Sequence, residues 1–338
     1  MKTYEDVVLA LRAPLPTEPS LRDFIRFATL APNSHNTQPW KFRLGDSHVD
    51  ILPDLSRRTP IVDPDDHHVI VTLGCAAENL LLAARSSGRS GEIGVEAQSV
   101  QETVIRVSLG KGSVSDAELA NAVLARQSTR SEYDGQALSS DELKMLESAS
   151  AQSGVDVVFI TERPKLEEAL EFVIEGNSAQ MDDPAFVQEL KDWLRFNAEA
   201  ALKTRDGLFS KCSGNPTMPT WISGFMFDQA FNKKRENEKY AKHIRSSAGI
   251  AIFLAEDESP SGWVDVGRSF NRFALQATTM GIRHAHLNMP VEVPELRPAF
   301  ADWLGMPGRR PNLVIRFGKA PAMPMSLRRP VDETLVST

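Results

Sequence analysis

The segment 31–40, Ala-Pro-Asn-Ser-His-Asn-Thr-Gln-Pro-Trp, constrains this chain most. Apolar residues recur at helical spacing over 21–30 and predict a helix, which Pro32 ends because its ring clashes with the preceding turn. An alternating run over 40–44 predicts a strand. The segment is therefore a short polar loop held between a helix and a strand. It is either a plain structural corner or a loop whose small polar side chains bind a ligand.

Composition places the chain among globular proteins. It has 338 residues, 41% of them hydrophobic and 25% charged, which allows one large domain or two medium ones. The net charge of -7 argues against general nucleic-acid binding. No apolar run reaches membrane-spanning length, and the N-terminus is acidic where a secretion signal would be basic, so we expect no membrane partner and a cytoplasmic protein. Two cysteines, Cys75 and Cys212, form no disulfide framework.

Two successive series of helices and strands can be predicted along the chain. The glycine-containing stretch at 110–113 is the expected joint between them, so we expect a first half over 1–110 and a second over 111–338. The first series comprises a hairpin of strands 41–44 and 48–52, a buried helix over 69–85 and a strand over 104–109. The second comprises helices over 116–125, 166–173, 185–195 and 263–280, a further helix that begins at 139, and strands over 155–160, 247–254 and 313–318.

An irregular region interrupts the second series. Residues 205–224 are rich in glycine, proline and asparagine, and loops of this length inside a domain are usually functional or mobile. We therefore predict a lid at about 200–240. The charged run 233–239 within it is typical of a solvated helix face.

Two basic stretches suggest an anion. Arg126-Gln127-Ser128-Thr129-Arg130 places two guanidinium groups around two hydroxyls, a combination that suits phosphate oxygens. The C-terminal stretch 304–331 contains no carboxylate. Either these cations pair with acidic protein surface or they surround a phosphate. The charged residues of the C-terminal stretch are Arg309, Arg310, Arg316, Lys319, Arg328 and Arg329.

Other sequence motifs give weaker indications. His67 and His68 follow an acidic stretch at 63–66, and His284 and His286 lie on one face of a predicted strand, but neither pair has further ligands at a recognisable spacing. We predict no metal site, solvated side chains for the first pair, and core or pocket positions for the second. Nucleophile-elbow, Walker and Gly-x-Gly-x-x-Gly motifs are absent, so a nucleotide would be held by side chains and helix ends.

Together these motifs resemble the FMN-dependent nitroreductase superfamily. The segment 31–42 is similar to its flavin-contacting loop, and Arg126-x-Ser128-x-Arg130 is similar to its phosphate motif. The chain is most similar to the long, internally duplicated Acg-like branch, a likeness that extends through 206–208, 244–249 and 328–330. The resemblance implies an α+β, nitroreductase-like fold. Its mixed, mostly antiparallel sheets would be flanked by helices, in two tandem halves that mimic the family homodimer.

The resemblance also implies which residues bind the flavin. In the family homodimer one subunit supplies the phosphate motif and a C-terminal arginine, and the other supplies the loop. Here the first half has the loop but Leu-Arg-Ala-Pro over 11–14 in place of the phosphate motif, while the second half has the motif but no such loop at 148–154. One complete FMN site is therefore expected per chain. Its expected ligands are Pro32, Asn33, Ser34 and Asn36 at the ring, Arg126, Gln127, Ser128, Arg130, Arg328 and Arg329 at the phosphate, and Asn288 and Met289 at the flavin N5 atom.

The function implied is that of a nitroreductase-like oxidoreductase. NAD(P)H would reduce FMN, and the flavin would then reduce a nitroaromatic or quinone-like small molecule in a ping-pong cycle. The flavin carries the chemistry, so no catalytic side chain is expected. We expect a monomeric pseudo-dimer and leave further homodimerisation open. The alternative is an FMN-binding or flavin-storage protein with little turnover, because the expected lid would cover the flavin.

Overall fold

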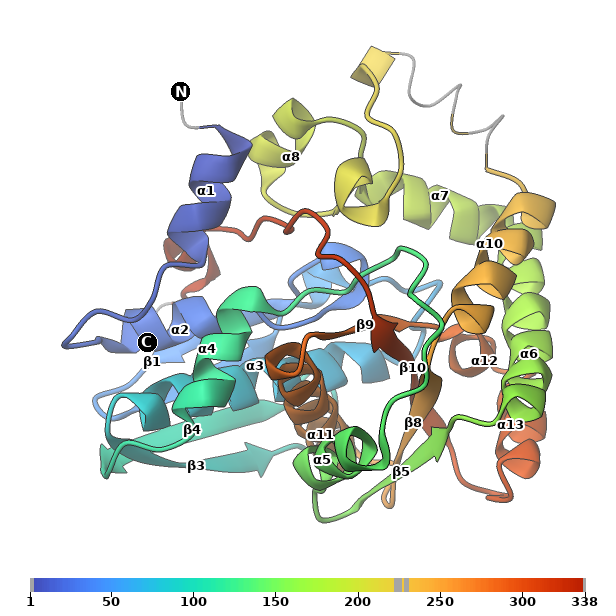
Figure 1. Cartoon of the computed structure of the whole chain (residues 1–338). Coiled ribbons are helices and arrows are strands. Elements are labelled where there is room, and N and C mark those ends of the chain that lie inside the picture. The colour runs from blue at the N-terminus through green and yellow to red at the C-terminus, as the bar shows by residue number, and fades with distance from the viewer. Residues whose placement is uncertain (1–2, 222–226, 228–230, 337–338) are drawn as a thin grey trace.

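Two four-stranded antiparallel sheets form the framework of the computed structural model, which describes residues 3–221, 227 and 231–336. The sheets lie on either side of a central pair of helices (Figure 1). The first has the strand order β1-β2-β4-β3 and the second the order β5-β8-β10-β9. The strands are β1 (Trp40–Leu44), β2 (His48–Pro53), β3 (Arg89–Glu96), β4 (Val104–Lys111), β5 (Val155–Ile160), β8 (Gly249–Ala255), β9 (Ile282–His286) and β10 (Pro311–Lys319).

The two sheets share one topology. In the first, the long helix α3 (His67–Ser86) connects β2 to β3, and in the second α11 (Pro260–Thr279) connects β8 to β9. Each helix therefore links the second strand of its sheet, in spatial order, to the fourth. The same arrangement occurs twice along the chain, which is what a duplicated unit produces. The division at residue 110 itself stays a prediction.

Helices α3 and α11 pack closely through two glycines. A Cβ atom on Gly74 would lie 2.2 Å from the Val264 carbonyl oxygen, and one on Gly267 would lie 2.0 Å from that of Val71. Each glycine thus meets the carbonyl three residues before the other glycine. Interiors tolerate no such overlap, so these two positions let the helix backbones approach to contact distance.

An ion-pair cluster accompanies the contact between the two central helices. Glu78 of α3 is 1% exposed, and its two carboxylate oxygens accept from Arg268 at 3.1 Å and Arg272 at 2.9 Å, both on α11. A buried carboxylate needs such partners to remain charged. These two ion pairs therefore link α3 to α11, and with them the two sheets, at one fixed register.

The remaining helices cover the outer faces and the upper edge. In Figure 1, α6 and α10 flank the second sheet, while α7 and α8 lie along the top of the view. The C-terminal segment crosses back to the first sheet, where Leu335 bridges to Phe42. The other helices and short strands are α1 (Tyr4–Leu11), α2 (Leu21–Ala28), α4 (Ala117–Ala125), α5 (Ser140–Ser150), α6 (Arg163–Asp182), α7 (Pro184–Trp193), β6 (Leu194–Arg195), α8 (Ala198–Thr204), β7 (Leu208–Phe209), α10 (Lys233–Arg245), α12 (Met289–Glu292) and α13 (Arg297–Trp303).

The predicted α+β class, with mostly antiparallel sheets flanked by helices, is confirmed, and the two tandem halves that mimic a homodimer stay a prediction. The hairpin, the buried helix and the strands of the second half form as expected. Strand β3 was missed because its arginine, serine, glycine and glutamate residues resemble a loop; it forms an edge of the first sheet by pairing with β4. Helix α2 ends at Ala28, several residues before Pro32, so the chain turns before the proline is reached.

Helix α3 is also long and apolar enough to cross a membrane, which the sequence analysis did not recognise. In the folded chain 89% of its most apolar window is buried inside the protein. Burial between two sheets accounts for its composition.

Substituting Gly267 with alanine should destabilise the protein. The added methyl group would meet the Val71 carbonyl and push the two central helices apart, so we expect the free energy of unfolding to fall by about 1–3 kcal/mol. Urea unfolding followed by circular dichroism measures this change. Gly94→Ala is the matched control, because a Cβ there meets nothing within 4 Å. Equal midpoints for the two variants would contradict the close packing.

Candidate functional site

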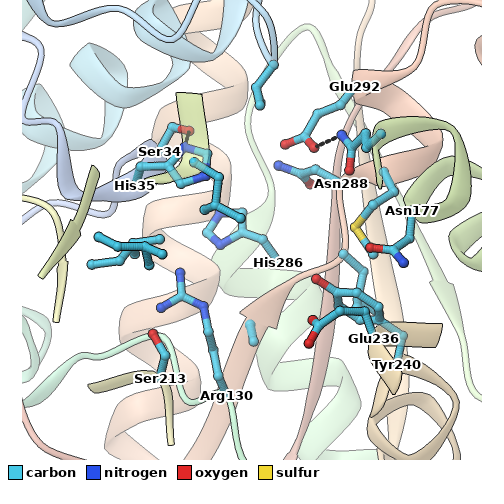
Figure 2. A pocket seen from close by; sticks show the side chains of 18 of the residues that line it. Ser34, His35, Arg130, Asn177, Ser213, Glu236, Tyr240, His286, Asn288 and Glu292 are labelled. Carbon is cyan, nitrogen blue, oxygen red and sulfur yellow. Dashed lines mark hydrogen bonds between the residues drawn. The ribbon is translucent and has the colours of Figure 1, made fainter. Parts of the chain in front are cut away.

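A cavity of about 390 Å³ lies where the two halves meet. That volume falls in the range of small-molecule and cofactor sites. The loop 31–40 and α3 contribute one wall, and the second half contributes Arg130 and the turn between β9 and α12 (Figure 2). Predicted site residues that line it are Pro32, Asn33, Ser34, Arg130, Asn288 and Met289.

The loop 31–40 has a strained backbone. His35, Asn36 and Gln38 have positive φ angles of 45°, 55° and 58°, a conformation that side chains other than glycine seldom adopt. Asn33 secures the loop from within, because its Oδ1 accepts from the Gln38 amide at 2.9 Å. Strain of this kind persists only where surrounding contacts fix it, and it is frequent at ligand sites.

Asn36 does not face the cavity, which corrects our placement of it at the ring. Its side chain is buried, donates to the carbonyls of Gly207 at 3.0 Å and Leu327 at 3.3 Å, and accepts from Arg328 at 2.8 Å. It therefore joins the loop to the base of the inserted region and to the C-terminal segment. The motif match identified a polar position of the loop but not the direction of its side chain.

Arg328 and Arg329 also lie behind the loop rather than in the cavity. Arg328 donates to the carbonyls of Thr29 at 2.6 Å and Ala31 at 3.1 Å, and Arg329 donates to that of Gln38 at 2.8 Å. These hydrogen bonds make both arginines supports of the loop, while the Nε of Arg329 is buried without a partner among the described residues. Neither arginine lines the cavity, and their expected contact with a phosphate stays a prediction.

Arg126 links the two halves and keeps free donors. Its Nη2 donates to the Leu30 carbonyl at 2.8 Å, while Nε and Nη1 are buried without a hydrogen-bond partner among the described residues. Buried guanidinium donors without partners are costly. They are the kind of atom that a bound anion would satisfy.

Two buried arginines, Arg126 and Arg328, and the half-buried Arg12 form a cluster without a carboxylate. Burial and the proximity of Arg126 lower the pKa of Arg12 to about 9, burial lowers the pKa of Arg126 to about 10, and burial with the charges of Arg12 and Arg126 lowers the pKa of Arg328 well below its usual value. Within the described ranges no Asp or Glu forms an ion pair with any of the three. The cluster therefore creates a strong positive field next to the loop.

The other residues of the Arg126–Arg130 motif have different surroundings. Arg130 lines the cavity, and no described residue forms an ion pair or hydrogen bond with it. Gln127 instead holds the C-terminal segment, with its Oε1 accepting from the Met323 amide at 2.6 Å. Ser128 forms a backbone bridge with His284 on β9. The structure thus brings Arg130 to the cavity and places Gln127 and Ser128 beside it as supports.

The turn after β9 forms the opposite wall. The side-chain oxygen of Asn288 accepts from the Val314 amide at 3.0 Å, which fixes the residue and leaves its NH₂ group toward the cavity (Figure 2). Glu292, one helical turn later, accepts from Gln180 Nε2 at 2.7 Å. Burial raises the pKa of Glu292 to about 7.

Sequence reasoning missed several cavity residues. Histidines at three of these positions have pKa values lowered by burial, to about 4 for His35 and about 3 for His243 and His286, so all three are neutral near pH 7. Spacing along the chain gave no indication of them, except that His286 was expected in a core or pocket. The missed lining residues include His35, His68, Thr72, Cys75, Asn177, Gln180, Glu236, Tyr240, His243, His286, Glu292 and Arg316.

Residues of the region 200–240, which we predict to form a lid, line part of the cavity. Arg57 and Arg195 form ion pairs with Asp206, which fixes the start of the inserted region against the loop 31–40. Lid residues 222–226 and 228–230 lie outside the described residues. Residues 233–239 are not simply solvated, because two of them reach the cavity. Inserted residues that line it are Leu208, Ser210, Ser213, Asn215, Pro216, Met218, Phe227, Phe231, Glu236 and Lys239.

The acidic stretch before α3 caps that helix. The Asp63 carboxylate accepts from the amides of His68 and Val69, each at 3.1 Å, and the Arg310 guanidinium lies 2.8 Å from His67 Nδ1. Both histidines are buried, so the prediction of solvated side chains is wrong. Asp63, His67 and His68 could geometrically hold a metal ion. The capping bonds and the arginine already account for the group.

Sequence comparison identifies relatives along the whole chain. No family model matches it. Two Mycobacterium tuberculosis proteins are similar to it. The one named "Putative NAD(P)H nitroreductase Rv3131" is 22% identical, over 96% of this chain and 94% of the relative. The one named "Putative NAD(P)H nitroreductase acg" is 23% identical, over 93% of this chain and 94% of the relative. The resemblance to Acg-like nitroreductases is confirmed.

Solved structures are similar at lower coverage. An FMN-bound nitroreductase from Bacteroides fragilis is 18% identical and covers 62% of this chain and 95% of its own, with a TM-score of 0.39. The nitroreductase NfnB from Mycobacterium smegmatis, in complex with NADPH, is 12% identical and covers 60% and 87%, with a TM-score of 0.40. The Acg-like sequence relatives, by contrast, match nearly end to end.

Replacing Arg328 with methionine should loosen the loop 31–40. The change leaves buried acceptors on Thr29, Ala31 and Asn36 without donors, so we expect the free energy of unfolding to fall by about 3 kcal/mol. Hydrogen exchange of the loop amides should rise together with a lower urea midpoint. Arg22→Met is the control, since its ion pair with Asp332 is exposed and contributes roughly 1 kcal/mol or less. An unchanged rate of hydrogen exchange at the loop amides in Arg328→Met would refute the positioning role of Arg328.

Proposed function

We propose that the chain binds one FMN in the cavity between its halves and works as a NAD(P)H-dependent, nitroreductase-like oxidoreductase. The main observation in support is that a single cavity is lined by residues of both halves. They are Asn33 and Ser34 from the first half and Arg130, Asn288 and Met289 from the second. In the family homodimer, those two groups come from different subunits. A single chain would therefore reproduce the dimer interface and its flavin site.

The side chains present suit FMN. Arg130 is a cavity-lining cation with no carboxylate partner among the described residues, and Arg126 keeps two buried donors without partners. A flavin phosphate carries nearly two negative charges, which both arginines would offset, while Arg12 and Arg328 add to the positive field. We place the phosphate at this end and keep Arg328 and Arg329 as supports of the loop.

The rest of the cavity would orient the ring system. Pro32, Asn33 and Ser34 would contact one face, and the backbone after β9 at Asn288 and Met289 would offer a donor to N5. When bound, FMN accepts a hydride from NAD(P)H and passes two electrons to a small-molecule acceptor such as a nitroaromatic or a quinone. The chain's part is to bind and orient both substrates and to exclude water. Phe186, Phe196 and Phe231 supply apolar surface for a planar substrate.

The second, pseudo-equivalent site would be degenerate. Arg12 follows α1 as Arg126 follows α4, and its Nη1 donates to the Leu124 carbonyl at 2.7 Å. It therefore caps the helix that presents Arg126. At the segment equivalent to the loop, Gln152 donates to Asp265 at 3.1 Å. Arg12 and Gln152, which stand at the equivalent positions, thus form hydrogen bonds within the protein. This supports one FMN per chain in a monomeric pseudo-dimer.

Arg130→Gln should weaken FMN binding by about 10- to 100-fold, because a charge-assisted hydrogen bond contributes roughly 1.5–3 kcal/mol. Titration of the apoprotein with FMN, followed by flavin fluorescence, gives both the dissociation constant and the stoichiometry. Lys234→Gln removes an exposed cation and should leave binding unchanged. A stoichiometry near two, or equal affinity in both variants, would contradict the assigned site.

Anaerobic mixing of the FMN-loaded protein with NADPH or NADH separates enzyme from flavin store. Loss of the flavin absorbance within seconds, followed by its return on adding a quinone or nitroaromatic, is the expected result. No reduction over many minutes would favour storage, since the inserted region would then keep NAD(P)H from the flavin.

A further inference from the structure

Glu292 stands out among the cavity residues because it lacks a positive partner. Its carboxyl group accepts from the neutral amide of Gln180 at 2.7 Å, and the described residues place no Lys, Arg or His within ion-pair distance. Glu236, in the same cavity, is ion-paired with Lys239. Partial burial without a cationic partner favours the protonated form of the Glu292 carboxyl group, and the hydrogen bond donated by Gln180 opposes that effect only in part.

The Glu292 side chain lines the cavity, where the proton of its carboxyl group can be donated to a bound molecule. Met289 and Glu292 are the first and last residues of the single turn α12, so the carboxyl group lies next to the segment that we assign to the flavin N5 atom. Figure 2 shows Glu292 and Asn288 on the wall across the cavity from Ser34 and His35. The Asn288 NH₂ group offers a second donor there.

We propose that the Glu292 carboxyl group protonates the electron acceptor and that this end of the cavity suits the carbonyl oxygen of a quinone. The inference rests on the proposed flavin function. A quinone takes a hydride, and hence two electrons, from the reduced cofactor, which is oxidised. The resulting hydroquinone anion then receives the second proton as the Glu292 O–H bond breaks and the acceptor O–H bond forms. The carboxylate regains its proton from solvent.

Surrounding charges keep the Glu292 pKa near neutrality. Burial and the Asp63 carboxylate raise it, while the Gln180 hydrogen bond and the charges of His67 and Arg297 lower it. Its pKa of about 7 lets the group give and regain a proton near neutral pH. Other ionisable groups that line the same cavity are Arg130, His35 of the loop 31–40, His68 and Cys75 of α3, Glu236, Lys239, Tyr240 and His243 of α10, His286 of β9 and Arg316 of β10.

The test compares the two half-reactions of the FMN-loaded protein. In Glu292→Gln the shape is kept and the acid is lost, so we expect reoxidation by a water-soluble benzoquinone to slow about 100-fold at pH 6 and to become independent of pH. In the unchanged protein that rate should fall as pH rises through about 7, because the proton is then lost. Reduction by NADPH should be little affected.

A spectroscopic readout accompanies the kinetics. Infrared difference spectra between pH 6 and pH 8 should show a protonated-carboxyl band in the unchanged protein that is lost in Glu292→Gln, beside a contribution that both proteins share from Asp66, whose pKa burial raises to about 6. Gln180→Met keeps the acid but removes the bond that lowers its pKa, so the pH midpoint of reoxidation should move upward. Glu175→Gln, an exposed change on the same helix as Gln180, is the control for charge.

The outcomes separate this inference from the function on which it rests. Failure to bind FMN, or no reduction by NADPH, would overturn both. Normal reduction combined with the same reoxidation rate and pH profile in Glu292→Gln would overturn the proton donor alone. Loss of the infrared band together with the slowed, pH-independent reoxidation would establish it.

Discussion

Guanidinium groups that hold the backbone carbonyls at the end of α2 are the interaction on which the site depends. Arg126, from the end of α4, donates to Leu30, and Arg328, from the C-terminal segment, donates to Thr29 and Ala31. Unpaired carbonyls at a helix C-terminus attract cations, so these contacts satisfy the helix end and fix the start of the loop. Because both arginines belong to the second half, neither half can shape the loop alone.

That dependence explains why the two halves must be held at one register. The reciprocal approach of Gly74 and Gly267 and the buried pairs of Glu78 with α11 fix α3 against α11. A small slip between these helices would carry Arg130 and the Asn288 turn away from Asn33 and Ser34. The packing contact and the cavity are thus two consequences of one interface.

Sequence reasoning located the elements of the cavity better than the roles of individual side chains. Asn33, Ser34, Arg130 and Asn288 line it as expected, because each belongs to a motif tied to a helix end or strand end. Asn36, Arg328 and Arg329 turn toward backbone carbonyls instead. A motif fixes which residues stand at a position, but side-chain direction depends on which acceptors the folded chain leaves unpaired. Glu292 belongs to no motif, and only folding buries it beside Gln180.

The sequence by itself determined the helix–loop–strand corner at 31–40, the buried helix α3, the antiparallel hairpin and the separation of loop and phosphate motif into two halves. These follow from local periodicity and motif spacing. The tertiary structure decided the repeated sheet topology, the edge strand β3, the burial of His67 and His68 and the difference in partners between Glu292, bonded to Gln180, and Glu236, ion-paired with Lys239. Those properties depend on which distant segments exclude water from a group and which partners they bring to it, and neither is encoded in spacing along the chain.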